Sequence, residues 1–225
     1  MKYIILIPSY EADNKLLNLL KEINKKYDTI VIDDGSKDKS IYDEVKKYAH
    51  LISYEINMGK GFALKTGFKY IKENYKDYVV VCMDSDGQHD LSDAIKLCDY
   101  VSEHKDVLAL GSRNWDKTTP LRSRFGNGIT RWVFKRKTGI NIHDTQTGLR
   151  AFSNELMDYM LSIKGNRYEY EMNVLLNLKS KNIAHRELDI KTIYIDNNKG
   201  SHFKPIKDSF KIYKDIFKWK KNNKK

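Results

Sequence analysis

The chain has 225 residues, of which 40% are hydrophobic and 32% are charged, so its composition excludes a disordered or fibrous protein. Lysine and arginine (41) outnumber aspartate and glutamate (30), and the net charge of +11 favours an anionic partner such as a phosphorylated substrate, a lipid surface or nucleic acid. No apolar run approaches the length that spans a bilayer, and we expect neither a membrane-spanning helix nor a signal peptide.

Short apolar strands alternate with helical patterns along the chain. We predict strands at residues 3–7, 29–32, 51–56 and 107–110 and another that begins at Val79, with amphipathic helices between them. This alternation predicts an α/β fold with a mostly parallel sheet covered by helices on both faces. We expect one domain over residues 1–205, followed by a basic amphipathic helix over residues 206–225.

The two cysteines do not suggest a metal site or a disulfide. Cys82 lies in the apolar run that begins at Val79, and Cys98 lies on a helical pattern. Neither has a cysteine or histidine neighbour at metal-ligand spacing, which favours reduced thiols and a cytoplasmic setting.

The strand that begins at Val79 ends at a group of polar residues. Asp84 and Asp86 are followed by Gly87 and the amide of Gln88. Ligand sites in parallel α/β sheets form beyond the carboxyl ends of strands, and two carboxylates with an amide oxygen suit a divalent cation that also binds phosphate. An alternative is a polar loop in which Asp90 simply caps the next helix.

Polar residues follow two other predicted strands. Asp33 and Asp34 precede Gly35, where they could bind a ribose or a base imide, although Asp-Asp-Gly-Ser is also ordinary turn chemistry. The loop at residues 57–61 could offer backbone N–H groups and the Lys60 ammonium to phosphate. It lacks the spacing of a P-loop and of the dinucleotide-binding glycine fingerprint.

Together these stretches resemble glycosyltransferase family 2, which has the GT-A (Rossmann-like) fold, and within it the polyprenyl-phosphate (dolichyl-phosphate) sugar synthases. The matching stretches are Ile7-Pro8-Ser9-Tyr10, Val31-Ile32-Asp33-Asp34-Gly35-Ser36, Asn57-Met58-Gly59-Lys60-Gly61, Asp84-Ser85-Asp86-Gly87-Gln88-His89, Gly111-Ser112-Arg113, Asp144-Thr145-Gln146-Thr147-Gly148-Leu149-Arg150-Ala151-Phe152 and Ser201-His202-Phe203-Lys204-Pro205. The resemblance spans nearly the whole chain. One departure is Glu11-Ala12, where the family often has Asn-Glu.

The resemblance implies a role for each group of residues. The nucleotide-sugar donor would be bound by Pro8, Tyr10, Glu11, Val31, Asp33, Asp34, Lys60, Asp84, Ser85, Asp86 and Arg113. Asp84, Asp86 and Gln88 would hold Mg²⁺ or Mn²⁺, and the catalytic residues would be Asp86, Arg113 and Arg124. The acceptor phosphate would be bound by Arg122, Arg124, Arg131, Lys199, His202 and Lys204.

The chemistry of the acceptor leaves two enzyme classes open. A polyprenyl phosphate oxygen is already anionic, so its transferase needs cations to hold two phosphates together and no general base. A saccharide hydroxyl needs a base, for which Glu169 is the strongest candidate, whereas we expect Glu171 to open a helix. Asp144 and Arg150 could line the acceptor side or form a structural pair. The first class, an inverting and metal-dependent transferase, is the leading hypothesis.

Two basic segments with aromatic residues favour a membrane surface. In the segment 122–137, arginines and lysines alternate with Phe125, Ile129, Trp132 and other apolar residues, and the tail beyond residue 206 has the same character. Such helices suit an anionic lipid surface, although each could instead pack on the domain. We therefore expect peripheral attachment at the cytoplasmic face, where a separate integral membrane partner could assist. A nucleic-acid-binding protein is the least favoured class, because it leaves the strand-end carboxylates unexplained.

Overall fold

The computed structural model describes residues 1–113, 121–193 and 216, with backbone alone for 121–127. Seven strands form one sheet in the order β3-β2-β1-β4-β6-β5-β7. They are β1 (Lys2–Ser9), β2 (Asp28–Asp33), β3 (His50–Ser53), β4 (Tyr78–Cys82), β5 (Val107–Arg113), β6 (Arg150–Ser153) and β7 (Ala184–Ile190). Every neighbouring pair is parallel except those of β6, which runs antiparallel to both β4 and β5. This confirms the predicted mostly parallel sheet.

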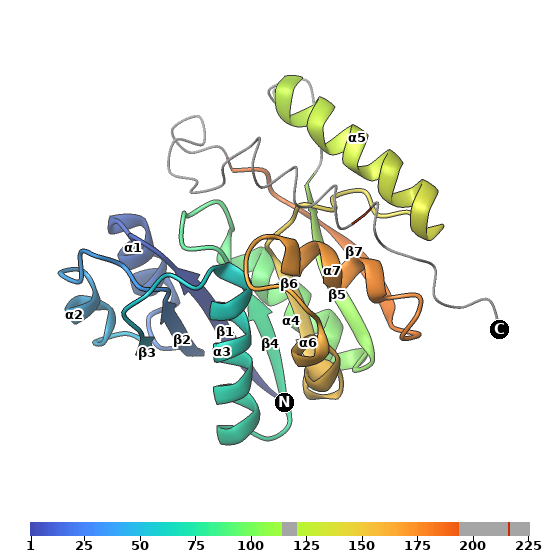
Figure 1. The fold of residues 1–225 in the computed structure, drawn as a ribbon. Coiled ribbons are helices and arrows are strands. Elements are labelled where there is room, and N and C mark those ends of the chain that lie inside the picture. The colour runs from blue at the N-terminus through green and yellow to red at the C-terminus, as the bar shows by residue number, and fades with distance from the viewer. Residues whose placement is uncertain (114–120, 194–215, 217–225) are drawn as a thin grey trace.

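Helices cover both faces of this sheet (Figure 1). The helices are α1 (Asn14–Ile23), α2 (Tyr42–Val45), α3 (Lys60–Asn74), α4 (Leu91–Glu103), α5 (Leu121–Thr138), α6 (Met157–Ser162) and α7 (Glu169–Asn177), with a short 3₁₀ turn at Asn154–Leu156. One apolar cluster joins α3, α6 and α7 to side chains such as Ile4 and Val80, and a second joins α1, α2 and α4 to Ile5 and Val81. The alternation of faces along β1 and β4 therefore divides the core into two layers.

Helix α5 combines a buried face and an exposed face. Val133 and Phe134 are buried in the core, whereas the side chain of Trp132 is 64% exposed and that of Ile129 is 41% exposed. The Arg136 guanidinium lies 5.8 Å from the centre of the Trp132 ring. The helix lies away from those that cover the sheet (Figure 1). The buried face agrees with packing of this segment on the domain, and its contact with a membrane stays a prediction.

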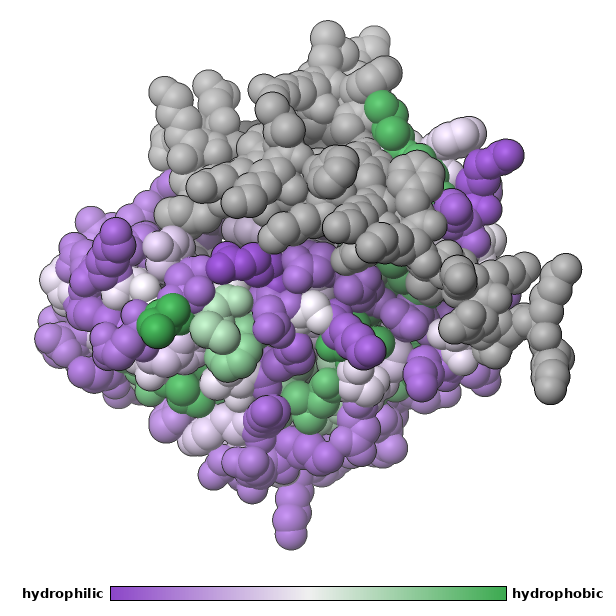
Figure 2. Space-filling view, viewed as in Figure 1, coloured by the Kyte–Doolittle hydropathy of each residue, from purple (hydrophilic) through white to green (hydrophobic). Residues whose placement is uncertain are grey.

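On the face that Figure 2 shows, the described surface is mostly hydrophilic, and its apolar residues form small separate areas. Within the described part of the chain, no helix is both long and apolar enough to cross a bilayer. Cys82 and Cys98 are buried free thiols, as predicted. Of the tail at 206–225 only Ile216 is described, and its side chain is buried in the first cluster. The predicted boundary at residue 205 lies outside the described residues.

The prediction of a strand at 51–56 was wrong at its end, and two strands were not predicted. Strand β3 stops at Ser53 because the following residues turn toward Asp34, and Ile56 is 72% exposed. Strand β6 has only four residues, and β7 is an edge strand in which polar residues dominate. Neither has the apolar run or the clean alternation that marks a half-buried strand.

Candidate functional site

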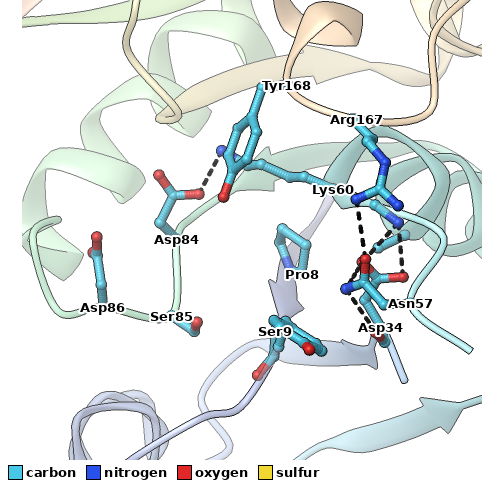
Figure 3. A pocket seen from close by; sticks show the side chains of 13 residues that line it. Pro8, Ser9, Asp34, Asn57, Lys60, Asp84, Ser85, Asp86, Arg167 and Tyr168 are labelled. Carbon is cyan, nitrogen blue, oxygen red and sulfur yellow. Dashed lines mark hydrogen bonds and ion pairs between the residues drawn. The ribbon is translucent and has the colours of Figure 1, made fainter. Parts of the chain in front are cut away.

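A cavity of about 480 Å³ lies at the carboxyl ends of β4, β1 and β2. We call it the outer cavity, and it is lined by Pro8, Ser9, Tyr10, Asp34, Asn57, Gly59, Lys60, Ala63, Asp84, Ser85, Asp86, Arg167 and Tyr168. Different loops form its two ends, as Figure 3 shows. One end holds Asp84, Ser85 and Asp86, and the other holds Asp34, Asn57 and Arg167. The cavity is therefore elongated along the edge of the sheet.

Asp34 organises the loop between β3 and α3. Its Oδ1 accepts hydrogen bonds from the Tyr54 hydroxyl at 2.7 Å and from the Met58 N–H at 2.8 Å. Its Oδ2 accepts from Asn57 Nδ2 at 2.9 Å and from the Gly59 N–H at 2.8 Å. The sequence suggests the N–H groups of the loop 57–61 as phosphate ligands, but those of Met58 and Gly59 are bound to this carboxylate. Asp34 lines the outer cavity, but its oxygens are already hydrogen-bonded.

Lys60 begins α3 and connects two carboxylates that are distant in sequence. Its ammonium lies 2.7 Å from Asp84 Oδ1 and 3.0 Å from Glu171 Oε1, and its side chain is 16% exposed. Burial opposes the ammonium form, but the charges of Asp84 and Glu171 outweigh burial and raise the pKa of Lys60. Lys60 is therefore a permanent cation at the centre of the site.

The two aspartates beyond β4 have opposite pKa shifts. Burial disfavours ionisation of Asp84, but the Lys60 ammonium and His89 outweigh it and hold the pKa of this carboxyl well below its usual range. For Asp86, burial and the nearby charge of Asp84 raise the pKa. His89 Nε2 lies 3.4 Å from Asp84 Oδ2, and its buried Nδ1 has no hydrogen-bond partner among the residues that the structure describes. A second cation beside Asp86 would stabilise its ionised form.

A second cavity of about 210 Å³, which we call the inner cavity, adjoins the same aspartates. It is lined by Lys60, Asp84, Asp86, Gln88, His89, Arg113, Thr145, Gln146, Gly148, Arg150, Tyr168, Glu171 and Met172. Four residues line both cavities: Lys60, Asp84, Asp86 and Tyr168. The carboxylates therefore lie where the two cavities meet.

Two arginines bring positive charge to the inner cavity. Arg113, the last residue of β5, donates from Nε and Nη2 to the two oxygens of buried Asp144, at 2.6 and 3.1 Å. Arg150 is buried and donates to the carbonyl oxygens of Thr147 and Glu171, while its Nη2 has no hydrogen-bond partner in the described part of the chain. Asp144 and Arg150 are thus each bound to other groups, and Asp144 pairs with Arg113 instead of Arg150.

The donor set of Asp84 and Asp86 fits a divalent cation that shares its coordination with phosphate. Both carboxylates line both cavities, and Gln88 lines the inner one. No group of three or more histidine, cysteine or acidic side chains at metal-binding distance occurs in the described part of the chain. Two carboxylates and an amide suit Mg²⁺ or Mn²⁺ that takes its remaining ligands from a bound diphosphate and water. The alternative prediction for this loop, that Asp90 caps the next helix, is also confirmed, because its side chain accepts from the Ser92 N–H at the start of α4.

The structure brings many of the predicted donor residues together. Those that line the outer cavity are Pro8, Tyr10, Asp34, Lys60, Asp84, Ser85 and Asp86, and those that line the inner cavity include Gln88 and Arg113. Glu11, Val31 and Asp33 line neither. Val31 is in the sheet core, the Asp33 carboxylate binds Lys39 at 2.6 Å, and Glu11 accepts from the Lys37 N–H. The roles of these three residues stay predictions.

Most of the predicted acceptor residues cannot be placed. Lys199, His202 and Lys204 lie outside the described residues, as do the side chains of Arg122 and Arg124. Arg131 Nη1 lies 3.2 Å from His143 Nδ1, and this arginine lines neither cavity.

Sequence reasoning missed two residues of the outer cavity, Arg167 and Tyr168, and undervalued Glu171. Glu169, the base candidate, lines neither cavity, and its Oε1 accepts from the N–H groups of Asn166 and Arg167 at 3.2 Å. The useful signal was Gly59 and Gly61. A Cβ atom at Gly59 would lie 2.5 Å from Arg167 Cγ, and one at Gly61 would lie 2.5 Å from the Cβ of Tyr170. These two glycines, which lack a Cβ atom, therefore allow the segment 165–170 to pack closely against the start of α3.

Comparison with known proteins gives one family. The model of glycosyl transferase family 2 matches residues 4–165. The UDP-N-acetylglucosamine–dolichyl-phosphate N-acetylglucosaminyltransferase of Methanococcus voltae is 30% identical, over 85% of this chain and 86% of its own. The dolichyl-phosphate beta-glucosyltransferase of Saccharomyces cerevisiae is 26% identical, over 94% of this chain and 72% of its own.

Solved structures show the same fold at low sequence identity. Glucosyl-3-phosphoglycerate synthase from Mycobacterium tuberculosis, in complex with Mn²⁺, UDP and glucosyl-3-phosphoglycerate, aligns with a TM-score of 0.67 and 16% identity, over 96% of this chain and 77% of that one. Mannosyl-3-phosphoglycerate synthase from Rubrobacter xylanophilus aligns with a TM-score of 0.69 and 15% identity, over 94% and 70%. The fold of this chain is therefore GT-A.

Proposed function

The chain belongs to glycosyltransferase family 2, and on that premise we propose that it transfers a sugar from a nucleotide donor to a polyprenyl phosphate, with inversion at the anomeric carbon. An oxygen of the acceptor phosphate attacks the anomeric carbon while the bond from that carbon to the nucleoside diphosphate breaks. The attacking oxygen already carries negative charge, so the step requires no proton transfer. Relatives whose names specify dolichyl phosphate as acceptor support this choice.

The observation that carries the proposal is the meeting of the two cavities at Asp84, Asp86 and Lys60. The outer cavity has the size and polar ends for a nucleoside diphosphate, and the inner cavity has the cationic side chains Arg113 and Arg150. A donor in the first and an anionic acceptor in the second would have their reacting atoms beside the carboxylates.

Asp84, Asp86 and Gln88 would hold Mg²⁺ or Mn²⁺, which when bound neutralises the charge that develops on the departing diphosphate. Lys60 adds a fixed cation at the same point, since Asp84 and Glu171 keep it protonated. Arg113 is aligned by the two oxygens of Asp144 and offers a planar cation to the phosphates. Arg124 and the other predicted acceptor residues remain part of the proposal without a described side chain.

The saccharide-hydroxyl alternative is weakened by the position of its proposed base. Glu169 lines neither cavity, and its Oε1 accepts from two backbone N–H groups, so it is not placed beside an acceptor bound in either cavity. Glu171 does line the inner cavity, but it is held by Lys60 at 3.0 Å. An acceptor hydroxyl would therefore have to compete with the Lys60 ammonium for this carboxylate.

We also propose that the protein attaches peripherally to the cytoplasmic face of a membrane through α5. Trp132 and Ile129 are exposed on this helix beside basic residues, an arrangement that suits headgroups and the acyl boundary. The basic tail and an integral membrane partner would add to this attachment. Nucleic acid is not part of the proposal.

The decisive experiment is a transfer assay with radiolabelled nucleotide sugars, polyprenyl phosphate and Mg²⁺ or Mn²⁺, in which the lipid product is resolved. Asp86→Ala should abolish turnover while the fold survives, because the cavity junction loses one of its two metal-binding carboxylates. Asp106→Ala, a change at an exposed aspartate far from both cavities, should leave turnover unaltered. A folded and active Asp86→Ala protein, or full activity in excess chelator, would contradict the metal assignment.

A further inference from the structure

Arg167 is an exposed cation at the edge of the outer cavity. Its Nη1 donates to Asn57 Oδ1 at 3.2 Å. No ion pair joins it to a carboxylate among the residues that the structure describes. A guanidinium that faces a cavity without a neutralising partner has several N–H donors to offer to a ligand.

The segment that carries Arg167 is held firmly on α3. The N–H of Phe62 donates to the carbonyl oxygen of Asn166 at 2.9 Å, and Glu169 accepts from the N–H of Arg167. The close approach of Gly59 leaves no space for a side chain between this glycine and Arg167 Cγ. Backbone and stem are thus fixed, and only the end of the side chain can adjust to a ligand.

The order of the strands indicates which part of the donor Arg167 meets. Asp84 follows β4, Asp34 follows β2 and Asn57 follows β3, in a sheet where β1 lies between β4 and β2. At about 4.8 Å between neighbouring strands, Asp34 is about 10 Å and the β3 end about 14 Å from the β4 end. If the diphosphate lies at Asp84 and Asp86, the opposite end of the cavity receives the nucleoside. Arg167 lies at that opposite end (Figure 3).

The polar groups around Arg167 are already hydrogen-bonded to one another, so the guanidinium is the group that can bind the base. Asn57 Oδ1 accepts from Arg167, and its Nδ2 donates to Asp34, so the orientation of this amide is set. Asp34 in turn is saturated by donors of the β3–α3 loop. A guanidinium can only donate, and it therefore requires an acceptor on the base edge, such as a keto oxygen.

We propose that Arg167 recognises the nucleobase of the donor by donating hydrogen bonds to a keto oxygen of uracil or guanine, an inference that rests on the proposed nucleotide-sugar chemistry. Adenine presents an amino group in place of the keto oxygen and offers only ring nitrogens as acceptors, so it would make weaker hydrogen bonds with the guanidinium. Arg167 is thus a specificity-determining residue of the donor site, one that the strand-end motifs do not contain.

The test is the equilibrium dissociation constant of UDP, GDP and ADP, measured with Mn²⁺ by calorimetry in the absence of acceptor. Arg167→Ala should weaken binding of the preferred keto nucleotide by about 10- to 100-fold, as expected for hydrogen bonds from a charged group, and should weaken ADP binding by a clearly smaller factor. Arg167→Gln retains the stem that packs on Gly59 and should give the same selective loss. Arg167→Lys should recover little, because an ammonium lacks the planar fork.

Lys65→Ala is the matched control. This lysine donates to Asn166 in the same segment at 2.9 Å but lines neither cavity, so all three constants should stay unaltered. An equal loss for ADP and the keto nucleotide would mean that Arg167 contacts the phosphates and would overturn the inference, as would the absence of any loss in folded variants. The calorimetry contains no acceptor, so the two proposals can fail separately. A selective loss in calorimetry, together with no transfer to polyprenyl phosphate in the transfer assay, would refute the proposed acceptor and leave this inference intact.

Discussion

Replacing Asp34 by asparagine tests whether this residue serves chiefly to fold the loop beside the donor cavity. The substitution preserves the volume, but one oxygen becomes an NH₂ group that must face existing donors. At the Oδ2 position, Asn57 Nδ2 and the Gly59 N–H would both lose their shorter hydrogen bond, and each would keep only a bond of 3.1 Å, to the backbone carbonyl oxygen and to Oδ1 of residue 34 respectively. The change also removes the charge that strengthens the bonds from Tyr54 and Met58.

The magnitude follows from these contacts. A hydrogen bond to a charged group contributes about 1.5–3 kcal/mol, and some of the loss is relieved when the Asn57 amide turns. We expect the free energy of unfolding to fall by about 3 kcal/mol. For a chain of this length that corresponds to a decrease in Tm of roughly 6–12 °C.

Urea and thermal denaturation followed by circular dichroism measure this change directly. Asp38→Asn provides the control, since Asp38 is exposed, accepts one backbone hydrogen bond, from the Ser40 N–H, that an asparagine oxygen can keep, and should change the urea midpoint far less. A loss below about 1 kcal/mol for Asp34→Asn would refute the reasoning, because it would mean that the saturated carboxylate contributes little to the fold.

Two further predictions concern pH and the membrane. The Lys191 ammonium, 2.7 Å from Asp90, lowers the pKa of this carboxyl to about 2, so its stabilising contribution is present above the ordinary value near 4 and is lost as the pH falls toward 2. Asp90→Asn keeps the helix cap but removes the titrating carboxyl, so the urea midpoint should fall less steeply as the pH is lowered from about 4 to about 2. An unaltered slope would show that the pair with Lys191 does not contribute. Trp132→Ala should reduce co-sedimentation with anionic vesicles without lowering Tm, whereas Ile56→Ala, at an exposed residue of the β3–α3 loop, should leave co-sedimentation unaltered. Equal binding by both variants would exclude the exposed face of α5 as the contact.

The sequence by itself determined the fold class and the position of the candidate site. Buried parallel strands appear as apolar runs, and their carboxyl ends are where such sheets bind ligands, so the pair Asp84 and Asp86 could be found from local pattern alone. The same local reasoning offered Asp90 as a helix cap, whereas Arg113, at the end of β5, was assigned from the family resemblance.

Only the tertiary structure decided how the remaining residues are used. Asp34 follows its strand just as Asp84 does, yet the β3–α3 loop folds over it and occupies both of its oxygens. Lys60 meets Glu171, and Arg167 meets Asn57, across more than a hundred residues of sequence. Hydrophobic periodicity reports which face of an element is buried, but a polar side chain is defined by the partner that packing brings to it, and that partner is not encoded in its neighbours along the chain.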